Sequence, residues 1–421
     1  MTPTDNSKKT SRLSRRAVIA TGSVAVAALA GCLGSDDGDE TDDRSDSPTG
    51  DDGQFGATPF VENPPDAVYK PTHRDPFVME PVVEAGDYAL LPHFTYAHRF
   101  WRVEGTETIE VFPQAGTGVH LMIAFWDRQT GELLPVDAGG TMEIRHDGET
   151  VETVTPWPML AQSMGFHFGD NVPLPEDGTY TVEVTLNPIA VRKTGAFEGR
   201  FEESETATFE FEWSRDLLEE LRNDVEFLPE EEWGERGAIE PMNHGDHGNH
   251  GDGEGGHDDG HGDGHHDDNH DDGHSDGHGD GHGDDHGDAP PPGLPPADAY
   301  PGTDLGTHES GDAAVVVRYL SESPLAEEGD GYLLVSPRTP YNRIPLPDMS
   351  LSVSGLTENG ATASLTQTLD DELGLHYGLS VTLSPGATFE LGVDVPPQIA
   401  RHQGYETAFL EMEPMEIEVP E

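Results

Sequence analysis

The feature that most constrains the fold is an internal repeat. When the sequence is shifted against itself by 209 residues, residues 165–195 align with residues 374–404 without a gap, and ten of the 31 pairs are identical. The motif GFHFG at residues 165–169 then faces GLHYG at residues 374–378. Self-similarity at a fixed offset indicates one structural unit present twice. The chain is therefore expected to hold two copies of one domain.

The segments around the repeat have the pattern of short β-strands. They alternate between apolar and polar residues, or form short apolar runs, and turn signals such as Asp147-Gly148 separate them. One helix is expected at residues 215–227, with Ser214 as its N-cap. The pattern predicts an all-β protein with two related Ig-like β-sandwich domains. The expected strands are residues 108–112, 119–126, 142–145, 180–186 and 208–213, and then 314–320, 332–336, 349–353 and 388–395.

The stretch WPMLAQSMGFHFGDNVP, residues 157–173, has neither the period of a strand nor that of a helix. It is predicted to be an irregular loop before the next strand. Met159, Met164 and His167 lie in it. Thioether and imidazole are ligands for soft or borderline metals, because thioether favours copper and imidazole suits copper, zinc and iron. The loop is therefore a candidate metal site.

The composition changes sharply along the chain and divides it into six segments. The predicted organisation is a signal peptide (1–32), a flexible acidic tether (33–58), a metal-binding β-sandwich (59–213), a short helix and connector (214–242), a disordered linker rich in histidine, aspartate and glycine (243–298) and a second, degenerate β-sandwich (299–421).

The N-terminus carries two export signals. Ser14-Arg15-Arg16 and the apolar run after it resemble a twin-arginine motif, and Leu29-Ala30-Gly31-Cys32 resembles a lipoprotein processing site. Cys32 is the only cysteine, so lipid attachment explains it better than a disulfide. The alternative is an uncleaved anchor helix. Both readings place the protein on the outer face of the membrane.

The charge balance points to a salty environment. The net charge is -60, from 82 acidic and 22 basic residues. Concentrated salt screens such self-repulsion, so the acidity is read as a haloarchaeal adaptation. Nucleic acid is not an expected partner, because no basic patch is present to meet phosphates.

Twelve of the 21 histidines lie in one low-complexity segment, between Gly, Asp and Asn residues. Such a segment is expected to be disordered and to bind Zn(II), Ni(II) or Cu(II) weakly at many points. The alternative is an acidic solvating linker with incidental histidines. The twelve are His244, His247, His250, His257, His261, His265, His266, His270, His274, His278, His282 and His286.

Three short motifs together resemble a known family. They are HLM at residues 120–122, PML at residues 158–160 and FHFGDNV at residues 166–172. They are similar to the strand motif HLEAD and the loop motif MPMVASDGPHYGxNV of the periplasmic iron-transport-associated metal-binding proteins. That family includes dimeric bacterial lipoproteins and copper- and iron-binding proteins of ferrous-uptake operons. The resemblance covers residues 118–190 and implies an Ig-like β-sandwich.

The resemblance also implies a ligand set. The family's copper ligands fall on His120, Met159 and His167, whereas its strand glutamate is Met122 here and its loop aspartate is Met164. A further family histidine has no counterpart in this half of the chain. The missing ligand is expected from Met122, Met164 or the other repeat. Exchanging carboxylate for thioether shifts the preference from Fe(II) toward Cu(I).

Other readings of these histidines stay open. His120 and His167 can instead be a buried, hydrogen-bonded pair beside packing methionines. The second copy keeps His376 but has Thr368 in place of the methionine, and His402 lies near the position of the missing family histidine. A degenerate structural copy is favoured there over a second working site. Three other histidines, His73, His93 and His98, are read as surface or packing residues. Of these, His93 and His98 can help to line a pocket.

The sequence thus predicts a lipid-anchored extracellular protein that binds copper or iron, with copper favoured, and serves metal uptake or buffering. The expected partners are the membrane, a metal permease and a second copy of the chain. The alternative is a surface interaction protein of Ig-like modules whose metal site is lost. The sequence has no activated nucleophile, phosphate loop or paired acid–base motif, so an enzyme is not expected.

Overall fold

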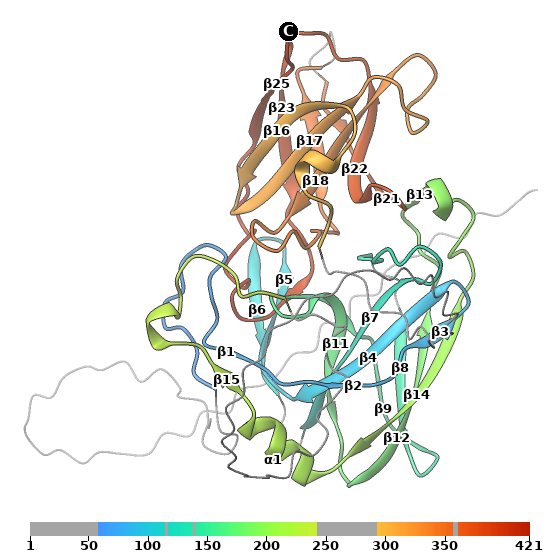
Figure 1. Cartoon of the computed structure of the whole chain (residues 1–421), viewed down its shortest axis with the longest axis vertical. Coiled ribbons are helices and arrows are strands. Elements are labelled where there is room, and N and C mark those ends of the chain that lie inside the picture. Colours follow the sequence, from blue (N-terminus) through green and yellow to red (C-terminus); the bar gives the residue numbers. More distant parts are fainter. Residues whose placement is uncertain (1–57, 114–116, 137, 139, 242–292, 357–360) are drawn as a thin grey trace, which may run out of the picture. The chain divides into compact units, whose positions relative to one another are not determined.

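The structure is a computed structural model, and it describes residues 58–113, 117–136, 138, 140–241, 293–356 and 361–421. The twin-arginine motif, Cys32 and the twelve histidines of the low-complexity segment lie outside these residues. Within them the fold is all-β, with one α-helix and short 3₁₀ turns (Figure 1). None of the helices in the described ranges has the length and apolar character needed to span a bilayer.

The first sandwich packs a nine-stranded sheet against a four-stranded one (Figure 1). The large sheet has the order β2-β4-β7-β11-β10-β24-β5-β6, with β3 paired to β4. The small sheet has the order β14-β12-β8-β9. The strands of the large sheet are β2 (Val78–Met79), β3 (Val83–Ala85), β4 (Tyr88–Tyr96), β5 (Phe100–Glu104), β6 (Glu107–Val111), β7 (Thr117–Asp127), β10 (Trp157–Ala161), β11 (Gly165–Pro173) and β24 (Ala400–Arg401), and those of the small sheet are β8 (Thr141–His146), β9 (Glu149–Val154), β12 (Gly178–Leu186) and β14 (Glu205–Trp213).

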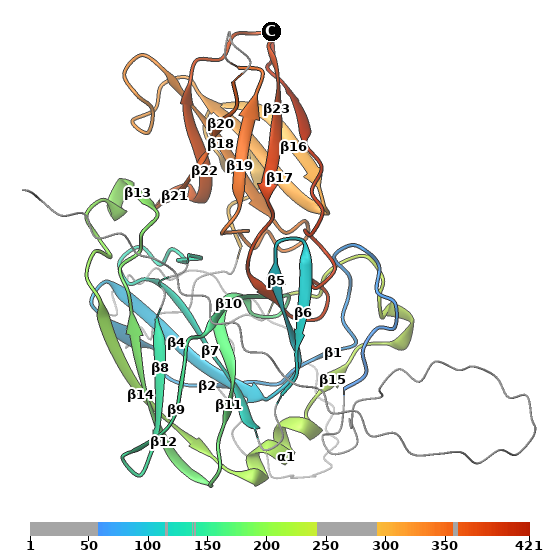
Figure 2. The same ribbon diagram turned by 180° about the vertical axis from the view of Figure 1, so that it is seen from behind.

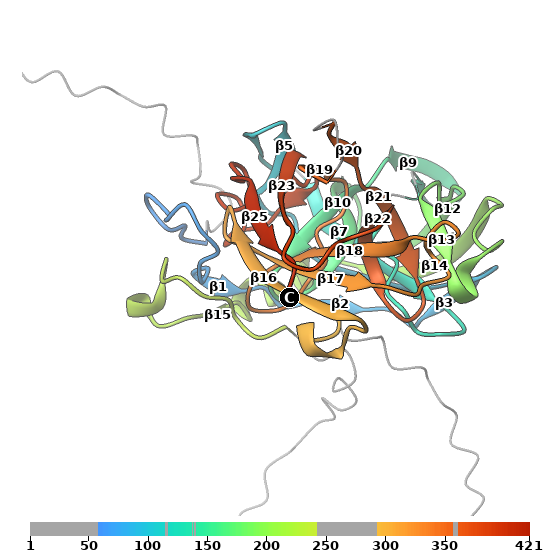
Figure 3. The same cartoon turned by 90° about the horizontal axis from the view of Figure 1, so that it is seen from above.

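The second sandwich has a six-stranded sheet, β13-β21-β22-β18-β17-β16, and a four-stranded sheet, β20-β19-β23-β25. Seen from above, these two sheets form separate layers (Figure 3). The strands are β13 (Arg192–Thr194), β16 (Thr303–Ser310), β17 (Ala313–Leu320), β18 (Gly331–Arg338), β19 (Ser350–Ser354), β20 (Ala363–Ser364), β21 (Thr366–Asp370), β22 (Gly374–Val381), β23 (Thr388–Val395) and β25 (Met415–Glu418). The prediction of two β-sandwiches is confirmed.

Each sandwich contributes one short strand to the other. Strand β13, from the first half of the sequence, pairs in parallel with β21, and β24, from the second half, pairs in parallel with β10. Equivalent strands pair in both exchanges, but the registers differ by one residue, because Arg192 lies opposite Thr368 whereas Met159, the counterpart of Thr368, lies opposite Ala400. The two copies of the repeat are thus joined by a reciprocal exchange of strands, which parallel pairing of distant segments permits.

The prediction of an irregular loop at residues 157–173 is wrong. These residues form a β-hairpin, β10 and β11, in the middle of the large sheet (Figure 2). The strand pattern was hidden because both faces of the hairpin are covered, so polar residues do not alternate with apolar ones. Phe166 and Phe168 point into the sandwich core, and His167 lies on the opposite face.

The predicted helix is present but shorter than expected. Helix α1 spans Arg215–Asn223, and the Oγ of Ser214 accepts a hydrogen bond of 3.1 Å from the Leu217 amide, as the N-cap prediction requires. The chain leaves the helix at Asp224 and continues into β15 (Glu226–Phe227), which pairs with β1 (His73–Arg74).

Candidate metal centre

One face of the large sheet carries the candidate ligands. On β7, Leu121 and Ile123 point into the sandwich core, so His120 and Met122 lie on the opposite face. His120 is fully buried and Met122 is 1% exposed. This face therefore places two donor side chains side by side in the interior, as the spacing of residues 120 and 122 predicted.

The hairpin adds two more donors to the same face. Met159 and His167 are direct neighbours across the β10–β11 pair, and both are almost completely buried. Gly169 lies opposite Met122, and a Cβ atom built on Gly169 would lie 3.0 Å from Cγ of Met122 and 3.1 Å from Nε2 of His120. The glycine thus leaves the space in front of the His120 ring open.

A fifth donor arrives from the second half of the chain. His402 follows β24, and its ring centroid lies 5.2 Å from that of His120 and 5.2 Å from that of His167. The sequence placed His402 in the second copy, but the strand exchange brings it into the first. It therefore occupies the place of the ligand that the first half lacks.

The loop that carries His402 is held by a buried arginine. Arg401 is inaccessible to solvent, and its guanidinium donates hydrogen bonds to the backbone carbonyls of Pro397, Tyr405, Ala408 and Phe409. Burial lowers the pKa of Arg401 to about 9. The four carbonyls of one loop are thus gathered around one cation, which fixes the backbone beside His402.

His98 completes the cluster from the turn between β4 and β5. Its Nε2 lies 3.0 Å from Nδ1 of His402, and its ring centroid lies 4.4 Å from that of His120. One ring nitrogen from each of His98, His120 and His402 can be chosen so that all three lie within 4.8 Å of one another. This spacing is compatible with a shared metal ion.

The hydrogen bonds determine which nitrogen of each ring is free to bind a metal. Nδ1 of His167 faces the Gly165 carbonyl at 3.3 Å, and Nδ1 of His120 faces Oδ1 of Asn171 at 3.1 Å. The amide nitrogen of Asn171 donates to the His98 carbonyl, so Oδ1 is an acceptor and His120 must carry its proton on Nδ1. Each ring therefore presents the lone pair of Nε2.

The same reasoning extends to His402. Nδ1 of His98 faces the Tyr96 carbonyl at 3.0 Å and so carries the proton, which makes Nε2 of His98 an acceptor for Nδ1–H of His402. The lone pair of His402 is then on Nε2. The Nε2 atoms of His120, His167 and His402 are all buried and have no hydrogen-bond partner among the described residues.

Burial keeps the imidazoles neutral. It lowers the pKa of His167 to about 4 and lowers the pKa of His98, and it brings the pKa values of His120 and His402 well below the ordinary value of 6.5. Neighbouring histidines lower the pKa values of His120 and His402 further. Only neutral imidazole binds a metal, so the ligands are ready at neutral pH.

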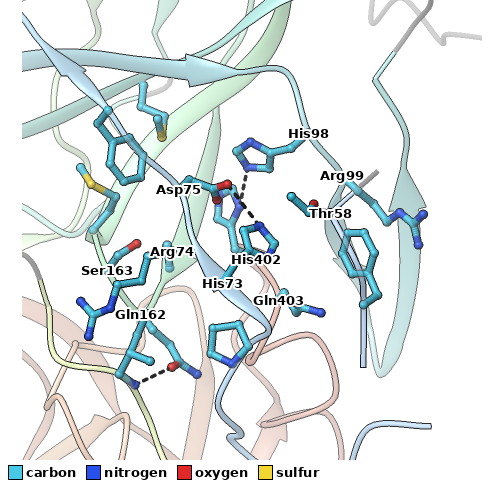
Figure 4. Close-up of a pocket in the computed structure, with 17 residues that line it drawn as sticks. Thr58, His73, Arg74, Asp75, His98, Arg99, Gln162, Ser163, His402 and Gln403 are labelled. Carbon is cyan, nitrogen blue, oxygen red and sulfur yellow. Dashed lines mark hydrogen bonds and ion pairs between the residues drawn. The ribbon is translucent and has the colours of Figure 1, made fainter. Parts of the chain in front are cut away.

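An open pocket leads to the cluster (Figure 4). It encloses about 600 Å³ of space between the lining atoms, and Met122, Met164, His98 and His402 line it together with residues 73–75. Asp75 is its only lining carboxylate among the described residues. Burial alone would raise the pKa of Asp75, but the neighbouring His73 and the hydroxyl of Tyr96 hold it below its ordinary value.

The predicted residues that the structure describes thus fall into two groups. His120, Met122, Met159, Met164, His167 and His402 lie in or beside one site, and His376 lies in the second sandwich. His120 and His167 are buried and each is hydrogen-bonded through Nδ1, as the alternative reading has it, but neither Nε2 has a partner among the described residues. His98 received only a general role as a pocket residue, because no sequence signal relates it to residue 402. His93 lies opposite Met122 on β4, and its ring centroid is 6.2 Å from that of His167.

The comparisons with known proteins give partial matches. A family described as a domain of unknown function (DUF7350) matches residues 298–418. No curated protein matches the chain. Among solved structures, a copper-bound variant of FetP from uropathogenic Escherichia coli is 20% identical over 34% of this chain and 96% of that chain, with a TM-score of 0.25. FetP in its as-isolated form is 20% identical over 33% of this chain and 96% of that chain, with a TM-score of 0.26. A copper-bound variant of P19 from Campylobacter jejuni is 15% identical over 28% of this chain and 96% of that chain, with a TM-score of 0.22.

Proposed function

We propose that this protein binds one transition-metal ion, with Cu(I) preferred, through Nε2 of His120, His167 and His402. The observation that carries the proposal is the set of three buried Nε2 atoms without hydrogen-bond partners among the described residues. A buried polar atom without a partner costs about 1–3 kcal/mol. Three such atoms, on two rings that each lie 5.2 Å from the His402 ring and on the His402 ring itself, are explained if an ion is their normal partner.

The sulfur atoms around the site support copper over iron. Met159 lies directly beside His167 in the sheet, and Met122 lies beside His120. The nearest carboxylate of the pocket, Asp75, is engaged by His73 at 3.2 Å and by the Tyr96 hydroxyl. Imidazole with thioether and without carboxylate suits Cu(I) better than Fe(II) or Mn(II).

The hydrogen-bond partners of the candidate ligands support metal binding rather than chance burial. His98 accepts from His402, Asn171 accepts from His120 and the Gly165 carbonyl accepts from His167, so all three candidate ligands have a partner that orients the ring. Metal-binding histidines almost always have such a partner on their other nitrogen. The proposed role includes no catalytic step.

We further propose that the chain works outside the cell, anchored through Cys32 after twin-arginine export, and that it buffers or delivers the ion for uptake by a membrane permease. The twelve-histidine segment would collect ions. Its described neighbour, Ile239, lines the pocket, and the carbonyl of Glu240 accepts a hydrogen bond of 3.0 Å from Arg74. The described residues that precede the segment in the sequence thus lie beside the pocket.

The test must distinguish metal bound at the specific site from metal bound by the twelve-histidine segment. In a full-length variant whose twelve segment histidines are replaced by asparagine, here called the Asn-segment chain, one Cu(I) per chain is expected in concentrated KCl. His120→Ala and His167→Ala should each remove it. Met159→Leu, which nearly preserves volume, should weaken Cu(I) relative to Zn(II).

Two results would count against the proposal. If the Asn-segment chain held no stoichiometric metal, and the histidine variants behaved like the parent, the reading as a surface interaction protein would replace it. Tighter binding of Fe(II) than Cu(I) in direct competition would overturn the choice of metal while leaving the site.

A further inference from the structure

The residue positions that surround the proposed site each have a counterpart in the second sandwich. In the second hairpin, Thr368 lies directly opposite His376, just as Met159 lies opposite His167 in the first. Both pairs are related by the offset of the sequence repeat. The imidazole is therefore retained in the second copy, and the thioether is replaced by a hydroxyl.

The central strands show what stands in place of His120. In the first copy, Asn171 of the hairpin lies opposite His120. In the second copy, Ser380, the equivalent of Asn171, lies opposite Tyr332. Tyr332 is thus the counterpart of His120, and by the same pairing Leu334 is the counterpart of Met122.

The tyrosine fills the space that the first copy keeps open. A Cβ atom on Gly378, the counterpart of Gly169, would lie 1.8 Å from the Tyr332 hydroxyl. That hydroxyl lies 3.1 Å from Nε2 of His376 and also interacts with the Thr368 side chain. It thus bonds the two residues that correspond to His167 and Met159.

The exchanged strands β24 and β13 also differ in the side chain that they bring to the site position. In the first copy, His402 comes two residues after Ala400, which lies opposite Met159. In the second copy, Arg192 lies opposite Thr368, so the residue that matches His402 is Thr194. The Thr194 hydroxyl donates to Oδ2 of Asp370 at 2.7 Å. The second copy therefore receives no imidazole from its partner strand.

We infer that the second sandwich holds the counterpart of the metal site, closed by Tyr332, and that the folded part of this chain binds one ion instead of two. The inference rests on the proposed function. The Tyr332 hydroxyl gives Nε2 of His376 the partner that the metal ion gives to His167. Reopening the space and restoring the donors would create a second site for a soft transition-metal ion.

The experiment restores three side chains in the Asn-segment chain, namely Tyr332→His, Thr368→Met and Thr194→His. The parent should bind one Cu(I) and the restored variant two. Adding His376→Ala should return the count to one, and adding His167→Ala should leave only the restored site. Thr368→Met with Thr194→His, in which Tyr332 still fills the space, is the matched control and should stay at one.

An ion bound at the first site shows that a variant is folded. A restored variant that keeps its first ion and gains no second one overturns the inference. If the triple variant also loses its first ion, the pair Tyr332→His and Thr194→His, which leaves the buried Thr368 unchanged, must gain a second ion or the inference fails. A parent that binds no ion at His167 would instead overturn the proposed function, so the two failures are distinct.

Discussion

Nε2 of His98 lies 3.0 Å from Nδ1 of His402, a residue 304 positions away in the sequence. Because Nδ1 of His98 is committed to the Tyr96 carbonyl, this contact requires His402 to donate through Nδ1. The contact therefore turns the lone pair of His402 toward the His120 and His167 rings. A residue from the first sandwich thus orients a ligand supplied by the second.

The first prediction follows from this contact. His98→Ala in the Asn-segment chain should weaken Cu(I) affinity about 10- to 100-fold, since loss of such a partner typically has an effect of this size. The ion count should stay at one when Cu(I) is in excess. Competition with a Cu(I) chelator measures the change. His308→Ala is the control, because His308 lies in the second sandwich and its ring is hydrogen-bonded to the Leu305 carbonyl at 3.0 Å; an equal loss there would contradict the role of His98.

The second prediction concerns the cost of holding the site empty. His167→Leu should abolish binding but raise the unfolding free energy of the metal-free chain by about 1 kcal/mol, because it removes a buried acceptor without a described partner. Denaturant unfolding of chelator-treated protein measures the change. His376→Leu is the comparison: its Nε2 is bonded to Tyr332, so the same substitution should destabilise the chain. If both variants were destabilised equally, His167 would be an ordinary core residue.

The sequence revealed the repeat, the fold class and most of the donors, but not their arrangement. His120 and Met122 could be placed together because alternation along one strand is a local property. The hairpin at residues 157–173 was read as a loop, since covering both faces of a strand removes the alternation that identifies it. His402 and His98 meet only through the exchanged strand β24, and no local pattern encodes such a long-range pairing.

The third prediction is an acid sensitivity. Burial lowers the pKa of both His167 and His376 to about 4. Below the unfolded value of about 6.5 the unfolded chain binds protons that the folded chain refuses, so stability falls as the pH falls from 6.5 to 4. Each histidine should remove about 3 kcal/mol over this window. Denaturant unfolding of the metal-free chain at pH 7 and pH 4 measures the loss, and His376→Gln should reduce it. A loss that is the same in the parent and the variant would contradict the assignment.

The fourth prediction uses the two arginines that the repeat makes equivalent. Arg401 is fully buried among four carbonyls of the loop that carries His402, whereas Arg192 is exposed and donates to the Leu325 carbonyl at 2.8 Å. Arg401→Gln should destabilise the chain by about 2–4 kcal/mol, because several buried carbonyls lose their donor. It should also weaken Cu(I) binding, because the loop no longer fixes His402. Arg192→Gln should change stability by about 1 kcal/mol or less and leave the affinity unchanged. Thermal melts with and without Cu(I) measure both effects, and a variant at Arg401 that melts earlier but binds Cu(I) as tightly as the parent would show that the loop is not what positions His402.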